Sequence, residues 1–176
     1  GSVVRNLAKR RNVSSNFRPK FAIKQNMRKI TFIEVKNETR KLMIYESKDE
    51  TYLFGYDCLQ DSFSKWDLWF SNIEDAEEYC EDNFSVVTED WIMIDEPKKD
   101  CQHDFIMPTK RISKEIFEIF VNGKWHENII TEKTQTFDGL TGNERLFISG
   151  LIDEFEKAKV NDSVKSNKIL KALNIN

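Results

Sequence analysis

The sequence predicts an α+β fold, in which an antiparallel sheet of about five to seven short strands carries one acidic helix and a C-terminal helical pair follows. Three observations support this prediction. Segments of β-favouring residues alternate apolar and polar side chains from residue 29 onward, one stretch of helical character interrupts them, and helical spacing returns after residue 140. The 176 residues, 39% of them hydrophobic, suit one compact domain or two very small ones.

Residues 1–26 are expected to form a basic arm rather than a folded unit. Pro19 interrupts any long helix in this stretch, where apolar residues are scattered among Ser, Asn and basic side chains. Gly1 and Ser2 have the character of a cloning scar. Met27 would also serve as a natural start, which leaves two interpretations open: the arm belongs to the native chain, or it is an upstream extension or an engineered addition.

Residues 27–130 are expected to form the α+β domain. The polar link at residues 48–50 is short enough for a hairpin between the second and third strands. Pro108 restricts the stretch around it to a sheet edge or to irregular structure. Asn122 and Gly123 tolerate positive φ, so they predict a type I′ hairpin turn. The first strands are expected at 29–35, 40–47, 51–57, 66–70 and 91–94.

A helix with one acidic face is expected from Ser71 to about Asn83. The order Ser71-Asn72-Ile73-Glu74 matches a capping box, in which the Ser71 hydroxyl accepts from the backbone of Glu74 and the Glu74 side chain reaches back. Its apolar stripe comprises Ala76, Tyr79, Cys80 and Phe84. Much of the remaining surface is acidic, with no basic residue interleaved: Glu74, Asp75, Glu77, Glu78, Glu81 and Asp82.

Residues 131–176 are expected to form a C-terminal helical segment. A second capping box, from Thr141 to Glu144, opens a helix that should run to about Lys159, with Gly150 on its apolar stripe. Asn161 or Asp162 can cap the last helix. The apolar side of that helix should comprise Val164, Ile169, Leu170 and Leu173.

Charge divides the chain into two parts of opposite sign. Residues 1–42 hold 12 Lys and Arg against 2 Asp and Glu, whereas residues 43–106 hold 4 Lys against 18 acids. Such asymmetry fits either an arm that crosses its own acidic domain or two regions that meet different partners. No apolar run reaches the roughly 18 residues that span a bilayer, so no membrane association is expected. Three widely spaced cysteines favour a reducing, cytoplasmic setting.

The sequence holds one compact group of chemically active side chains, at Cys101, His103 and Asp104. With Cys58 and Cys80 these groups could ligate zinc, but zinc sites in small domains take their ligands in close pairs, and here there is a single pair. The sequence holds no Gly-rich phosphate loop, GxSxG turn or HExxH motif. We therefore expect no metal, no cofactor and no catalysis; an enzyme or metal protein centred on Cys101 and His103 is the third hypothesis.

Two stretches resemble known groups of proteins. MIYESKDETYLFGYD, WDLWFSNIEDAEEYCEDNF and EDWIMIDEPKKDCQHDFIMP together resemble small bacterial proteins of unassigned function, with a strand pair, an aromatic strand and an acidic helix. GLTGNERLFISGLIDEFEKA resembles a helical tail of other uncharacterised bacterial proteins. The acidic module is similar in character to immunity proteins that neutralise bacterial toxins, which implies binding to a basic protein partner such as a toxin.

The first hypothesis is a non-catalytic bacterial binding protein, immunity-like or inhibitor-like, that contacts a basic partner through the six carboxylates of the acidic helix. Trp66 and Trp69 precede this helix and could anchor the interface beside its carboxylates, or they could be core residues. The alternative is a nucleic-acid-associated regulator that uses the arm to neutralise phosphates, in which the basic contacts are Lys9, Arg10, Arg11, Arg18, Lys20 and Lys24.

Overall fold

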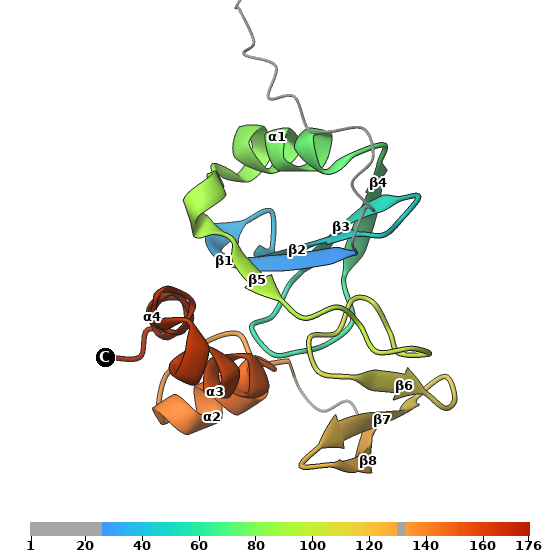
Figure 1. Ribbon diagram of the computed structural model, residues 1–176, viewed down its shortest axis with the longest axis vertical. Helices are drawn as coiled ribbons and strands as arrows, with labels where there is room; N and C mark the ends of the chain where they lie inside the picture. Colours follow the sequence, from blue (N-terminus) through green and yellow to red (C-terminus); the bar gives the residue numbers. More distant parts are fainter. Residues whose placement is uncertain (1–25, 130–132) are drawn as a thin grey trace, which may run out of the picture.

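The computed structural model describes residues 26–129 and 133–176, and it confirms the α+β class. Five strands form one antiparallel sheet in the order β4-β3-β2-β1-β5, and three more form a second sheet in the order β6-β7-β8 (Figure 1). The described residues therefore hold eight strands in two sheets, where the sequence predicted five to seven in one. The strands are β1 (Met27–Lys36), β2 (Thr39–Glu46), β3 (Thr51–Tyr56), β4 (Trp66–Phe70), β5 (Ile92–Ile94), β6 (Thr109–Arg111), β7 (Ile116–Val121) and β8 (Lys124–Ile129).

Helices cover both faces of the five-stranded sheet. In Figure 1, α1 lies across one face, while α2, α3 and α4 lie beyond the other. A short 3-10 turn at Thr88–Asp90 leads from α1 into β5. The helices are α1 (Ile73–Phe84), α2 (Gly142–Ile148), α3 (Ile152–Asn161) and α4 (Ser163–Ala172).

Neighbouring residues of β2 contribute to two different cores, because successive side chains of a strand point to opposite faces. Leu42 and Ile44 are fully buried in the core beneath α1. Met43, between them, is fully buried in the core that the C-terminal helices cover. Burying one such side chain stabilises the fold by about 1.5–3 kcal/mol, so this strand contributes to both sides of the sheet.

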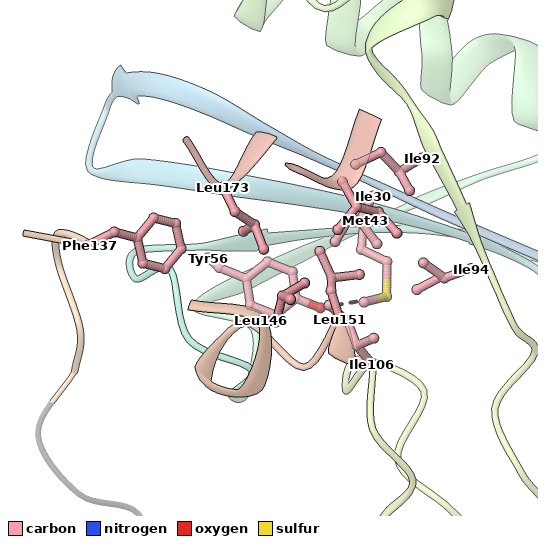
Figure 2. Close-up of a cluster of buried hydrophobic side chains, with 11 residues drawn as sticks. Ile30, Met43, Tyr56, Ile92, Ile94, Ile106, Phe137, Leu146, Leu151 and Leu173 are labelled. Carbon is pink, nitrogen blue, oxygen red and sulfur yellow. Dashed lines mark hydrogen bonds between the residues drawn. The ribbon is translucent and has the colours of Figure 1, made fainter. Parts of the chain in front are cut away.

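The core between the sheet and the C-terminal helices is shown in Figure 2. Tyr56 of β3 is fully buried there, and Leu146 and Leu151 approach it from the helical side. The Tyr56 hydroxyl donates to the backbone oxygen of Asp104 at 2.6 Å and lies 3.7 Å from the sulfur of Met43. Residues 137–173 and the sheet therefore share one core.

The start of α1 lies one residue later than the sequence predicted. Asn72, not Ser71, is the N-cap, and its side-chain oxygen accepts from the backbone N–H of Asp75 at 2.8 Å. The Asn72 amide in turn donates to the Asp75 carboxylate at 2.9 Å. Asn is as favourable as Ser at a helix N-cap, so the sequence pattern alone did not distinguish Asn72 from Ser71 as the capping residue.

The helix predicted from Thr141 to Lys159 is two helices. Gly150 has a φ of +79°, which ends α2, and α3 begins at Ile152. The Thr141 capping box is present as predicted, and Asp162 caps α4 by accepting from the backbone N–H of Lys165. Val164 was expected on the apolar side of the last helix, but it is 68% exposed.

The segment between β5 and β6 connects the two sheets and is held by Arg28 of β1. The guanidinium of Arg28 is buried and donates to the backbone oxygens of Asp95, His103, Phe105 and Ile106. Beyond this segment, the hairpin of β7 and β8 turns at Asn122 and Gly123, both with positive φ, as the sequence predicted.

Candidate functional site

The acidic face of α1 is the main predicted binding surface, and the structure places it on the outer side of the helix. Glu78, Glu81 and Asp82 are exposed, and none of the salt bridges recorded among the described residues involves them. We call the six carboxylates the α1 surface: Glu74, Asp75, Glu77, Glu78, Glu81 and Asp82.

The carboxylates of Glu77 and Asp75, which belong to the α1 surface, also have contacts within the fold. Glu77 forms an ion pair with Lys29 of β1, which the sequence pattern did not reveal because the two positions are far apart in the chain. Asp75 takes part in the N-cap with Asn72. Burial lowers the pKa of Lys29 to about 8, so the amine that meets Glu77 remains charged at neutral pH.

The charge on the second half of α1 opposes the helix dipole. Carboxylates stabilise the N-terminal end of a helix, whereas the C-terminal end favours cations. Glu81 and Asp82 lie in the last turns of α1, and no basic residue lies in its last turn. Placing like charges here costs stability, on the order of a few tenths of a kcal/mol for each residue.

The two tryptophans expected beside the α1 surface lie on opposite faces of the sheet. Trp66 points toward α1, where its ring stacks on Phe84 with 6.0 Å between ring centroids and its indole N–H donates to Thr39 Oγ1 at 3.1 Å. Trp69 lies three residues further along β4. Because successive side chains of a strand point to opposite faces, Trp69 points to the other face, and it is 59% exposed. Trp66 is thus half-buried beneath α1, and Trp69 does not extend the α1 surface.

The cysteines and His103 do not converge on one centre. Cys58, Cys80 and Cys101 are buried free thiols, and no group of three potential metal ligands occurs among residues 26–129 and 133–176. Burial raises the pKa of Cys80 to about 12 and also raises that of Cys101, the reverse of an activated thiolate. His103 is exposed, and its ring lies 4.7 Å from that of Tyr45.

The predicted nucleic-acid contacts lie outside the described residues. They are Lys9, Arg10, Arg11, Arg18, Lys20 and Lys24.

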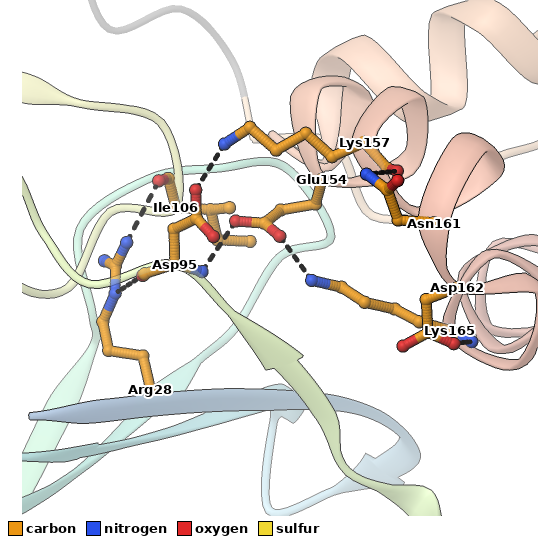
Figure 3. A network of polar contacts seen from close by, with 8 residues as sticks. All are labelled: Arg28, Asp95, Ile106, Glu154, Lys157, Asn161, Asp162 and Lys165. Atoms are coloured by element: carbon orange, nitrogen blue, oxygen red, sulfur yellow. Dashed lines mark hydrogen bonds and ion pairs between the residues drawn. The ribbon is translucent and has the colours of Figure 1, made fainter. Parts of the chain in front are cut away.

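A network of charged side chains, with Arg28 and Glu154 buried at its centre, joins the sheet to α3 and α4 (Figure 3). Glu154 is 5% exposed, and its carboxylate accepts from the backbone N–H of Asp95 at 2.7 Å and from Lys165 Nζ at 2.6 Å. Arg28 and Glu154 both border a cavity of about 290 Å³. Because both side chains are hydrogen-bonded within the fold, we interpret this network as structural, holding the sheet against α3 and α4. No local sequence motif indicated it.

In the part of the chain that the structure describes, no helix is long and apolar enough to cross a membrane. No family model matches the chain, and neither does any curated protein or any solved structure.

Proposed function

We propose that the chain is a non-catalytic binding protein, immunity-like or inhibitor-like in character, that contacts a basic protein through the α1 surface. The observation that carries this proposal is the exposed carboxylates on the second half of α1, where they oppose the helix dipole. These carboxylates lower the stability of their own helix, so attraction to a positively charged partner explains their presence better than a contribution to folding does.

The electrostatics of α1 would act mainly on the rate of encounter. A one-signed surface attracts an oppositely charged partner and raises the association rate, an effect that salt reduces. Release is slowed by apolar contacts at the same interface. Met93 is suited to this role because it pairs with Lys29 in the sheet, faces the α1 side and is 45% exposed.

The partner that fits best is a bacterial toxin or similar protein with a basic cleft, which α1 would cover. Blocking that cleft needs no chemistry from this chain. Free thiols at all three cysteines support a reducing, cytoplasmic site of action.

The test is a charge-reversal comparison on the full chain. Proteins retained by the wild-type chain from an extract of the source cell are identified and purified, and their affinities are measured for two variants. Glu78→Lys with Glu81→Lys and Asp82→Lys should weaken binding by about tenfold or more. A matched control reverses three exposed acids outside α1, Glu115, Asp138 and Asp153, and should leave the affinity within about threefold. Equal affinities for the two variants would contradict the proposal.

A further inference from the structure

A row of large side chains crosses the five-stranded sheet on the face opposite α1. The strand register places Arg28, Tyr45, Tyr52 and Trp69 directly beside one another on β1, β2, β3 and β4. The segment that follows β5 covers the Arg28 end, through the four backbone oxygens described above. The Trp69 end stays open, since this indole is 59% exposed.

A groove of about 520 Å³ lies along the open end of this row. One wall is the sheet surface at Tyr45, Tyr52 and Phe54, and the other is the turn that contains His103 and Asp104. The rings of Tyr52 and Phe54 are stacked nearly parallel, with an interplanar angle of 6° and 6.0 Å between centroids. Trp69 pairs with Tyr52 across the strands and so extends the same aromatic surface.

Three carboxylates line this aromatic groove, and no lysine or arginine does so within the described ranges. Asp104 is fixed in position, because its carboxylate accepts from both the backbone N–H and the hydroxyl of Ser64. Glu50 accepts from the Tyr52 hydroxyl, which holds it at the rim. Asp67 is exposed on β4, beside the aromatic row.

We propose that the aromatic groove is a second binding site, which seats an arginine side chain of a partner polypeptide. A guanidinium is planar, stacks on aromatic rings and pairs with carboxylates through a fork of N–H donors. The groove offers both elements on adjacent walls. A neutral sugar would also stack on the rings, but it carries no positive charge to pair with the three carboxylates.

This site is independent of the proposed function, because it lies across the sheet from α1. The two surfaces can therefore be tested separately, and the failure of one leaves the other standing.

The experiment follows backbone amide and indole NMR signals of the full chain while acetyl-Gly-Arg-Gly-amide is added. The matched probe replaces arginine by citrulline, which keeps the shape and removes the charge. The signals of Tyr52, Phe54 and Asp67 and the indole of Trp69 should shift with the arginine peptide. Binding of the citrulline peptide should be weaker by about fivefold or more.

Two variants locate the effect. Glu50→Gln with Asp67→Asn should weaken arginine-peptide binding by about fivefold, whereas Glu78→Gln with Glu81→Gln on α1 should leave it unchanged. Equal binding of both peptides, or shifts centred on α1, would overturn the proposal.

Other occupants give distinct results that also overturn it. Tighter binding of free arginine than of the peptide would assign the groove to an amino acid. Shifts with N-acetylglucosamine and none with the arginine peptide would assign it to a carbohydrate. Binding that emerges only after Arg18, Lys20 and Lys24 are replaced by Gln would assign it to the N-terminal residues of this chain.

Discussion

The indole of Trp66 lies directly over Gly55, so that a Cβ atom at position 55 would overlap Cε2 and Cζ2 of the ring. The two residues pair across β3 and β4, and the absence of a side chain at Gly55 lets the indole lie flat against the strand. This close approach allows Trp66 to reach both Thr39 and Phe84.

Gly55→Ala is therefore expected to lower the free energy of unfolding by about 2–3 kcal/mol, because the indole must move away from its partners. Urea unfolding measures the change. In a Trp66→Leu background the same substitution should cost less than about 1 kcal/mol, since the overlapping ring is gone. The same cost in both backgrounds would show that the indole contact is not the cause.

Gly150→Ala should destabilise the chain for two reasons. The φ of +79° strains any residue with a Cβ, and that Cβ would lie 2.7 Å from Asp61 Oδ2. We expect a loss of about 2–4 kcal/mol. Gly139→Ala is the matched control, because Gly139 has a φ of +75° with open space around it and should cost about 1–2 kcal/mol. Equal losses of stability in the two variants would show that the contact with Asp61 adds nothing to the cost at Gly150.

Asp61 should make stability depend on pH. Its two carboxylate oxygens accept from the backbone N–H groups of Ile106 and Met107, and burial raises its pKa to about 6. Between the ordinary pKa of 3.8 and this value, the folded chain holds a proton that the unfolded chain has released. The contribution of this group to stability therefore rises as the pH falls from about 6 toward 4.

The measurement compares the wild-type chain with Asp61→Asn by urea unfolding at pH 7 and pH 4.5. Relative to the variant, the wild-type chain should gain about 1–2 kcal/mol at the lower pH, while contributions from other groups cancel in the difference. If the difference in the free energy of unfolding between the wild-type chain and Asp61→Asn is the same at both pH values, the raised pKa of Asp61 is contradicted.

Lys165→Met should cost about 2 kcal/mol, because it leaves the buried carboxylate of Glu154 without its cation. Lys159→Met provides the matched control on the same pair of helices, since the Lys159–Glu156 pair is exposed on both sides and should contribute less than about 0.5 kcal/mol. Chemical denaturation of both variants tests this. Adding Glu154→Gln to Lys165→Met should restore part of the loss, and no restoration would mean that packing dominates.

The local elements of the fold could be predicted because each has a local cause. Strand alternation, the Asn122–Gly123 turn and the Asp162 cap are determined by residues close together in sequence. The break at Gly150 could not be predicted in this way. A glycine on an apolar helical stripe is compatible with a continuous helix, and its positive φ accompanies the close approach of Asp61.

The arrangement of the candidate site was only partly predictable. Helical periodicity correctly separated the buried stripe of α1 from its acidic face. Period-two alternation also implied that Trp66 and Trp69 could not share a face, if they lie on one strand. How much of the face opposite α1 stays open depends on the segment held by Arg28, whose hydrogen bonds span up to 78 residues of sequence. No local pattern contains that information.

The alternation of β2 between two cores also has an evolutionary consequence. Among divergent sequences that keep this fold, substitutions at Met43 should covary with positions in the C-terminal helices, and substitutions at Leu42 and Ile44 should covary with α1. Substitutions at three consecutive positions of the chain would then follow two independent sets of compensating changes in the helices.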